Sequence, residues 1–219
     1  MRGRDEAVVR QAASLLLGYP DQVWRGRLPG ITRAVGELPR GGARAALAEF
    51  CAHAAGAAER ELCEHYVDVF DLRHRRSLHM TYYSDGSTRR RGHALVEIGG
   101  VYTAAGWKLT ARELPDHLAV VLEFTARGDA RAGEALLARL RPGLELLRAA
   151  LHDHGTPYAR VVDAVHLTLP PGSGRDRERA RRLAAQGPPA EDVGLEPYGA
   201  GTPLPLTDVS GRSGEGARR

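Results

Sequence analysis

The sequence predicts an all-α protein, with a single helical bundle over residues 1–169 and a Pro/Gly-rich, mostly disordered tail over 170–219. Apolar residues recur at intervals of three and four in one segment after another, which is typical of amphipathic helices. No run alternates with the period of two that marks a strand. The last 50 residues contain 7 of the 13 prolines and 9 of the 26 glycines. A segment of this composition buries too little apolar surface to offset the entropy lost when it becomes ordered.

The first helices follow from apolar spacing and from helix-stopping residues. Asp5–Leu17 carries apolar residues along one face, and Gly18 follows as a stop signal. We expect a short second helix over 20–24, after which Pro29 either kinks the chain or starts another turn toward Leu38.

Two further helices are expected before residue 72. Residues 43–58 contain 9 alanines, which are strong helix formers and allow close approach. The next helix buries one face, defined by residues at i, i+4, i+7 and i+8. These residues are Leu62, Tyr66, Val69 and Phe70.

Helical periodicity stops between Leu72 and Thr88, where the paired Tyr82 and Tyr83 precede a Ser-Asp-Gly turn signal. We therefore expect a long irregular loop. Loops of this length inside a compact domain are often functional.

The next helix is predicted to start after Thr88, its N-cap, and to reach Ala105. The two glycines at 99–100 are expected to mark a place where helices pack closely. Pro115 suits the first turn of the following helix, and Asp116 would then complement the helix dipole.

Residues 118–124 are apolar nearly all round the predicted helix, which places it at the centre of the bundle. Ala130–His152 is expected to be kinked or split at Pro142, and a last bundle helix covers Tyr158–Leu169. An isolated helix over Arg175–Gln186 is the only order expected in the tail.

Composition restricts the class of protein. The net charge of +4 permits an acidic partner without requiring one. No apolar run is long enough to span a membrane, and charged residues at the start give no signal-peptide pattern. With two cysteines and no disulfide framework, we expect a cytoplasmic protein.

Three histidine-containing pairs resemble zinc ligands but have unsuitable spacing. Cys51 with His53, and Cys63 with His65, stand two apart on predicted helices, so their side chains diverge by about 200°. The pair at 152 and 154 fails for the same reason, unless its helix has already ended before His154. We predict no metal site and no bound cofactor.

Basic clusters at 73–76 and 89–91 flank the tyrosine loop. Cations beside aromatic side chains can bind nucleic acid, but no nucleic-acid-binding module is present. A helical protein that handles a cofactor or nucleotide through these arginines is the alternative hypothesis.

No phosphate-binding loop or catalytic motif occurs, so we do not expect an enzyme.

Three runs carry a resemblance to a known family. They are Glu64–Leu72, Ser77–Gly92 and Glu113–Phe124, and they occur in family order within about Ala12–Thr168. The chain resembles the nitrate reductase delta-subunit chaperones, the NarJ-like branch of the TorD-type redox-enzyme maturation proteins. The Tyr-Tyr loop followed by Thr-Arg-Arg-Arg-Gly points to the nitrate reductase branch in particular.

The resemblance implies an all-helical cytoplasmic chaperone that is not a subunit of the finished enzyme. It implies binding of the N-terminal segment of the catalytic (alpha) apo-subunit, retention for molybdenum cofactor insertion, and assembly with the membrane partner. Contact with the membrane would be indirect, through the enzyme complex. The peptide-binding residues that it suggests are Tyr66, Phe70, Tyr82, Tyr83, Pro115, Asp116 and His117.

These residues provide a physical mechanism for peptide binding. An amphipathic peptide can lay its apolar face into a groove of a helical bundle, with tyrosines supplying contact area and Asp116 pairing with a basic side chain. Tyr66 and Phe70 fit a core position as well as a groove. From the residues alone, Asp116 reads as a helix-dipole residue and His117 as a histidine at the edge of the core.

Overall fold

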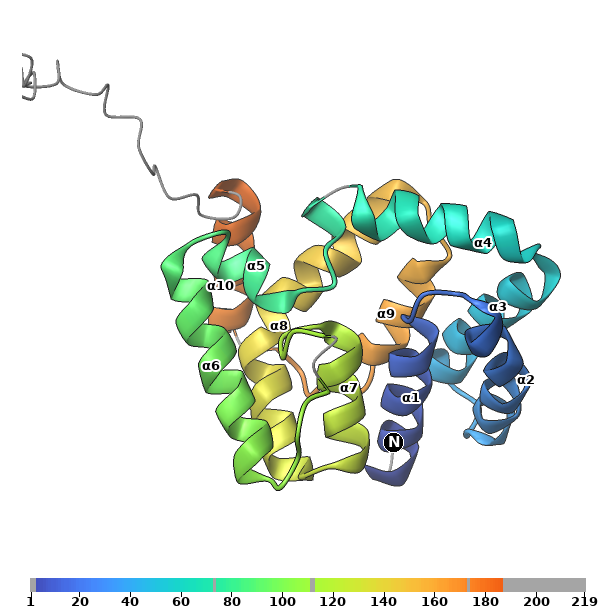
Figure 1. Cartoon of the computed structure of the whole chain (residues 1–219), viewed down its shortest axis with the longest axis horizontal. Helices are drawn as coiled ribbons and strands as arrows, with labels where there is room; N and C mark the ends of the chain where they lie inside the picture. Colours follow the sequence, from blue (N-terminus) through green and yellow to red (C-terminus); the bar gives the residue numbers. More distant parts are fainter. Residues whose placement is uncertain (1–2, 73, 111–112, 173, 187–219) are drawn as a thin grey trace, which may run out of the picture.

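The structure is a computed structural model that describes residues 3–72, 74–110, 113–172 and 174–186. Within these ranges the chain is helical and forms no β-strand, which confirms the predicted all-α fold (Figure 1). None of the helices described is both long enough and apolar enough to cross a bilayer.

The chain begins with three helices, α1 (Gly3–Leu16), α2 (Gln22–Glu37) and α3 (Gly42–Gly56). Asp21 caps α2 by accepting a hydrogen bond from the backbone N of Trp24 at 2.8 Å. The short helix expected over 20–24 is instead one long helix, α2, which continues through Pro29 to Glu37. Its apolar face is continuous across the proline, so burial outweighs the lost hydrogen bond.

α4 (Glu59–Tyr66) continues into a π-helical turn over Val67–Asp71. The wider turn changes the backbone hydrogen bonding, and Arg76 donates from Nε to the Val69 carbonyl at 2.8 Å and from Nη2 to the Asp68 carbonyl at 3.0 Å. π-helical turns are rare and frequently accompany functional sites.

The segment expected to be irregular contains a 3₁₀ turn (His74–Arg76) and a short helix, α5 (Met80–Asp85), which ends at Gly86 with φ of 59°. The loop prediction was therefore wrong for these residues. Six residues are too few to display a helical period, and α5 is held by packing against α8.

α6 (Arg89–Ala104) begins after Thr88, as predicted. Gly99 and Gly100 do not mark close packing, because a Cβ at either position would meet nothing within 4 Å. α7 (Leu118–Arg127) starts later than predicted, so Pro115 and Asp116 lie ahead of the helix. Asp116 is instead drawn into a network with the preceding loop.

α8 (Ala130–His154) is a single helix through Pro142 and is neither split nor interrupted there. It is followed by α9 (Tyr158–His166) and α10 (Gly174–Gln186). The helix predicted in the tail is present, and it packs against α8 instead of standing alone. The predicted disorder of 187–219 lies outside the described residues.

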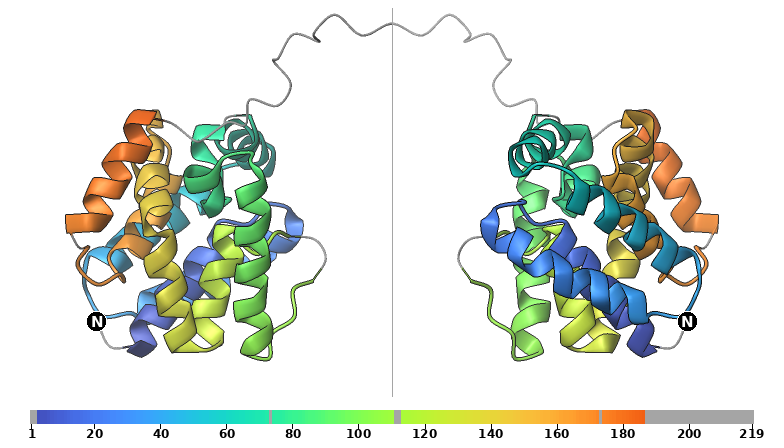
Figure 2. Two further views of the ribbon diagram at one scale, coloured as in Figure 1. Left: turned by 90° about the vertical axis from the view of Figure 1, so that its left-hand side faces the viewer. Right: turned by 90° about the vertical axis from the view of Figure 1, so that its right-hand side faces the viewer.

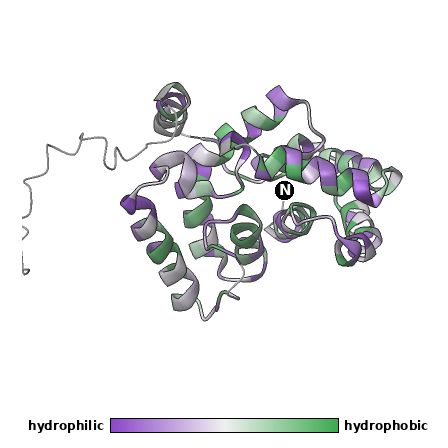
Figure 3. Cartoon of the chain, turned by 45° about the horizontal axis from the view of Figure 1, so that its top comes forward, coloured by the Kyte–Doolittle hydropathy of each residue, from purple (hydrophilic) through white to green (hydrophobic). Residues whose placement is uncertain are grey.

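The core forms where α1 packs on α7, α7 on α8, and α3 on α9, while α4 crosses the top of the view (Figures 1 and 2). Val121 and Leu122 of α7 are fully buried, which agrees with a central position. Hydrophobic and hydrophilic residues alternate along the helices, as amphipathic packing requires (Figure 3).

A buried arginine ties the two ends of the bundle together. Arg10 of α1 is 3% exposed and donates from Nε to Thr168 Oγ1 and from Nη2 to the Thr168 carbonyl, both at 3.1 Å. The same guanidinium forms an ion pair with Glu134 of α8. Residues 158 positions apart are thereby joined.

Candidate functional site

The segment 113–117 leads into α7 and is anchored from two sides. The backbone N of Met80 donates to the Asp116 carbonyl at 3.0 Å, and the N of Leu118 donates to the Leu78 carbonyl at 2.8 Å. On the other side, the hydroxyl of Tyr102 in α6 donates to the Pro115 carbonyl at 2.7 Å. The loop before α5 and the start of α7 are thus paired like two short strands.

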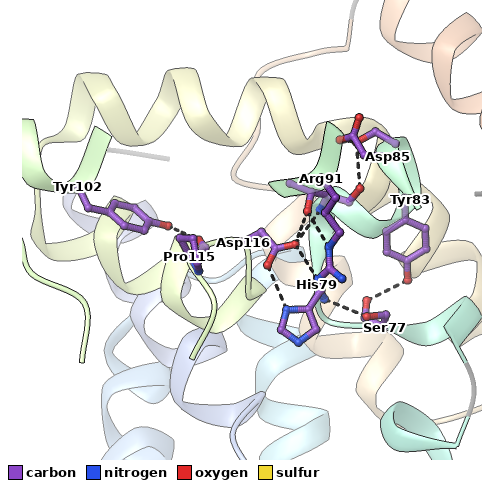
Figure 4. A network of polar contacts seen from close by, with 10 residues as sticks. Ser77, His79, Tyr83, Asp85, Arg91, Tyr102, Pro115 and Asp116 are labelled. Carbon is purple, nitrogen blue, oxygen red and sulfur yellow. Dashed lines mark hydrogen bonds and ion pairs between the residues drawn. The ribbon is translucent and has the colours of Figure 1, made fainter. Parts of the chain in front are cut away.

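Asp116 lies at the centre of this pairing and is completely buried (Figure 4). Its Oδ1 accepts a hydrogen bond from His79 Nδ1 at 3.1 Å, and its Oδ2 accepts from the backbone N of Thr81 at 3.1 Å and from its hydroxyl at 2.5 Å. Arg91 of α6 adds an ion pair, with Nη2 3.6 Å from Oδ2.

Burial by itself would raise the pKa of Asp116, but the hydrogen bonds from His79 and Thr81, with the charges of His79 and Arg91, lower it below the ordinary value. The carboxylate is therefore ionised and occupied by the protein's own groups. In this conformation it holds the loop in place and is not presented to a basic side chain of a partner.

His117 is only partly buried, and its ring meets that of His79 edge to face with centroids 5.2 Å apart. Its Nδ1 is buried and has no hydrogen-bond partner among the described residues. Burial lowers the pKa of His117, and the carboxylate of Glu113 opposes that shift. His117 is thus a neutral ring near neutral pH, at the edge of the buried network.

Tyr66 and Phe70 belong to an aromatic cluster inside the bundle. They are 8% and 7% exposed, and both rings pack on Tyr158 of α9. The Tyr66 hydroxyl donates to the Leu17 carbonyl at 3.2 Å. Of the two positions that the sequence allowed, core and groove, both side chains occupy the core.

The paired tyrosines lie on α5. Tyr83 is buried, and its hydroxyl is 3.1 Å from the Arg75 carbonyl and 3.0 Å from the Ser77 carbonyl, either of which can accept its proton. Tyr82 is half-buried and meets the Tyr83 ring at a centroid distance of 6.3 Å. α5 fits closely on α8, since a Cβ at Gly143 would lie 2.9 Å from the Met80 carbonyl oxygen.

Three carboxylates act electrostatically on Tyr66 or on Tyr19, which packs against it. The pKa of Tyr66 is raised chiefly by burial, and also by the charges of Asp71 and Glu113. The pKa of Tyr19, which packs on Tyr66 at 5.4 Å, is raised first by a hydrogen bond with Cys63, then by desolvation and by nearby charges that include Asp71 and Asp21. We call the surface with Asp21, Asp71 and Glu113 the acidic face.

Exposed apolar side chains adjoin the acidic face. Tyr19 is 49% exposed, Leu72 directly follows Asp71 and is 65% exposed, and Leu114 directly follows Glu113 and is 42% exposed. Sequence reasoning did not select any of these three. A lone Tyr-Pro-Asp turn after the first helix was the one available signal for Tyr19.

A second feature, the α6–α7 groove, lies beside Pro115 and was also missed. It is a cavity of about 360 Å³ between the end of α6, the segment that follows it, and α7. Its lining is Tyr102, Trp107, Lys108, Leu109, Thr110, Glu113, Val120, Glu123 and Phe124. The only sequence signal was the position of Trp107, one of two tryptophans in the chain, just past a helix end.

The histidine pairs considered as metal ligands point to separate partners. His152 Nε2 lies 2.9 Å from Asp163, His154 Nε2 lies 3.1 Å from Asp68, and His65 Nε2 lies 2.8 Å from Thr156 Oγ1. In the described part of the chain, no group of three or more metal-ligating side chains has suitable geometry.

The basic clusters are partly used inside the fold. Arg76 binds the carbonyls of the π-helical turn, Arg91 pairs with Asp116, and Arg90 Nε lies 4.0 Å from an oxygen of Asp85. Arg73 is outside the described residues. These contacts leave fewer cations to gather around a phosphate than the sequence indicated.

Comparison with known proteins gives consistent matches. The family described as nitrate reductase delta subunit matches residues 37–163, a range that includes the loop, α5 and the segment 113–117. A Bacillus subtilis relative, assigned as the nitrate reductase molybdenum cofactor assembly chaperone NarJ, is 30% identical over 77% of this chain and 92% of its own length.

Other relatives are covered less completely. The nitrate reductase molybdenum cofactor assembly chaperone NarJ of Escherichia coli is 35% identical over 45% of this chain and 42% of that protein. The nitrate reductase-like protein NarX of Mycobacterium tuberculosis is 35% identical over 72% of this chain but only 24% of its own length.

One solved structure has the same fold. A protein from Archaeoglobus fulgidus, assigned as a redox enzyme maturation protein, superposes with a TM-score of 0.57 at 20% identity. The match covers 76% of this chain and 93% of that one. At this level of identity the likeness concerns the fold alone.

Proposed function

This chain belongs to the nitrate reductase delta-subunit family, and from that membership we propose that it is a molybdenum cofactor assembly chaperone for nitrate reductase. In this role it acts on the catalytic (alpha) subunit before the cofactor is inserted. It works in the cytoplasm, catalyses no reaction, and meets the membrane only through the assembling enzyme.

The client segment in this proposal is the N-terminal peptide of the catalytic apo-subunit. Binding that segment keeps the apoprotein from completing its assembly with the membrane partner until the cofactor is in place. The chaperone needs a surface that combines apolar contact area with charge, because an amphipathic helix presents both.

The observation that carries the proposal is the grouping of exposed apolar side chains beside carboxylates. Among the described residues, six large apolar side chains are exposed, and three of them adjoin the acidic face: Tyr19, Leu72 and Leu114. The chain as a whole carries a net charge of +4, so this cluster of acids differs in sign from the protein's overall charge. Acids around exposed apolar groups suit a basic, amphipathic peptide.

The buried network supports this surface without touching the peptide. Asp116 fixes the segment 113–117 through His79 and Thr81, and this segment carries Glu113 and Leu114 outward. Asp116 is thus a positioning residue in the proposal, and the acids that meet the client are Asp21, Asp71 and Glu113.

The alternative, a cofactor- or nucleotide-handling protein that uses the arginine clusters, gains no support from the geometry. Arg76 and Arg91 are both committed to internal partners. Neither Arg76 nor Arg91 lines any of the four cavities compared among the described residues.

The test is isothermal titration calorimetry of the full chain with a synthetic peptide of the catalytic subunit's N-terminal segment. We expect binding that weakens at least tenfold when Asp71→Lys and Glu113→Lys are combined, and that weakens with added salt. Glu37→Lys is the control, because this exposed residue ends α2 about 22 Å along the helix from its start.

Absence of any binding by the unmodified chain would contradict the proposed function. The double variant changes the net charge by twice as much as Glu37→Lys. A loss of binding free energy in Glu37→Lys of at least half that in the double variant would show that the overall charge, and not the acidic face, governs the interaction.

A further inference from the structure

The α6–α7 groove differs from the acidic face in being concave and largely apolar. Its floor is made by Tyr102 and Phe124, which are buried and pack with ring centroids 4.7 Å apart. Trp107 forms a wall, half-buried and edge to face with Phe124 at 6.1 Å. Leu109 and Val120 complete the apolar lining.

The shape of the groove suits a single large side chain. An apolar cavity of about 150 Å³ is enough to hold a benzene-sized ring, and the groove encloses about 360 Å³. It therefore has room for an aromatic or leucine side chain together with part of the backbone that carries it. Buried aromatic-lined pockets of this kind are where binding hot spots occur.

The rim of the groove carries unequal charges. Glu123 accepts a hydrogen bond from Arg127 at 2.8 Å, and Arg127 lies 6.0 Å from the centroid of the Trp107 ring, so this acid already has a cation beside it. Glu113 is exposed and forms no ion pair with any residue that the structure describes. The exposed Lys108 also lines the groove, and among the described residues Glu113 is the rim carboxylate to which no cation is paired.

Glu113 also belongs to the acidic face, so the groove and the face share an edge. A peptide that crosses Glu113 can place an apolar side chain in the groove while its basic residues lie along the carboxylates. This continuity indicates a peptide-binding site with two parts: the α6–α7 groove, which can bury an apolar side chain, and the acidic face, which can pair with basic side chains.

We infer that the α6–α7 groove receives one large apolar anchor side chain of the client peptide, with a basic residue of the same peptide paired to Glu113. The inference rests on the proposed function and adds to it the part of the surface where most of the binding energy arises. It predicts a peptide motif, an aromatic or leucine residue next to a lysine or arginine.

The first test fills the groove. Val120→Trp extends a ring into the cavity, and Val96→Trp makes the same chemical change on α6 at a side chain that is 77% exposed and outside the groove. In calorimetry with the catalytic subunit's N-terminal peptide, we expect Val120→Trp to weaken binding at least tenfold and Val96→Trp to leave it within twofold of the unmodified chain.

The second test needs no change in the groove. Trp107 lines it, whereas Trp24 is 5% exposed within the core between α1 and α2. Peptide binding should shift the tryptophan emission with the midpoint found by calorimetry, and Trp107→Phe at saturating peptide should abolish the shift. This keeps the inference testable even if Val120→Trp fails to fold.

Alanine scanning of the peptide identifies the anchor. Replacing the anchor should cost as much affinity as Val120→Trp, and combining the two changes should add little. If the peptide binds but Trp107 emission stays constant and Val120→Trp binds normally, the groove is not the anchor site, while the proposed function stands. If the unmodified chain binds no peptide at all, the proposed function itself fails.

Discussion

His79 and Asp116 are 37 residues apart in sequence, yet His79 Nδ1 donates to Asp116 Oδ1 at 3.1 Å inside the fold. This bond, with those from Thr81, joins the loop before α5 to the start of α7. Hydrogen bonds to this carboxylate therefore hold together a junction that contains no regular secondary structure of its own.

Asp116→Ala should lower the free energy of unfolding by about 3–5 kcal/mol, because it leaves buried donors and the Arg91 charge without their acceptor. Urea unfolding followed by circular dichroism measures this. Far-UV helicity at zero denaturant should remain, since Asp116 itself lies ahead of α7 and outside the helices. Client binding should weaken through the displaced segment.

Asp153→Ala is the control for that change, because Asp153 is an exposed acid near the end of α8. It should alter stability by no more than about 0.5 kcal/mol. Similar losses in the two variants would mean that the Asp116 network contributes little.

Acid should weaken the fold through Asp116. Its folded-state pKa lies below the unfolded value of about 3.9, so its stabilising contribution is fully present above that value and is lost as the pH falls toward the folded pKa. Urea unfolding from pH 5 to pH 3 should show a steep loss of stability in the unmodified chain. The loss should be shallower in Asp116→Asn, and parallel curves would argue against this role.

His65 should give a separate pH dependence nearer neutrality. Its pKa is lowered first by burial and then by neighbouring histidines, while Asp68 opposes the shift. The unfolded chain therefore takes up a proton at about pH 6.5 before the folded chain does, so stability falls as the pH drops below that value. The loss of stability between pH 7.5 and pH 5.5 should be smaller in His65→Asn.

His93→Asn is the matched control, because His93 is an exposed histidine on α6. Its unfolding curve should follow that of the unmodified chain across this pH range. An identical pH dependence in His65→Asn and the unmodified chain would show that His65 is not responsible.

Two glycine substitutions should act in opposite directions. Gly143→Ala places a Cβ 2.9 Å from the Met80 carbonyl oxygen and 3.2 Å from the Tyr83 ring, so α5 must move, at a cost of about 1–3 kcal/mol. Gly99→Ala meets nothing within 4 Å and should stabilise α6 by about 0.5–1 kcal/mol. Thermal unfolding compares both, and stabilisation by Gly143→Ala would contradict the close packing of α5 on α8.

The sequence was sufficient to predict long helices such as α1, α6 and α8, because their apolar period extends over many residues and is set locally, whereas α2 was predicted to be short. α1, α6 and α8 begin within about two residues of the predicted starts, which rested on the Thr88 cap for α6 and on helical periodicity for the other two. The helix at α5 was missed, since six residues that include Tyr82 and Tyr83 do not display a period. Its formation depends on the surface of α8.

The candidate site was predictable only in part, for a tertiary reason. The importance of the segment 115–117 followed from the family resemblance, but the burial of Asp116 depends on His79 and Thr81, which no local pattern connects to it. The groove around Trp107 arises where α6 and α7 converge, and periodicity within either helix does not reveal that meeting.

The contact between Arg10 and Thr168 also has a consequence for synthesis. At about 5–20 residues per second, a ribosome needs about 8–30 s to add the 158 residues that separate them. For about the first two thirds of that interval α1 exists without α7, and α9 is completed only near its end, although both helices cover the apolar side of α1. The nascent protein therefore has to be protected from aggregation before it can guard another polypeptide.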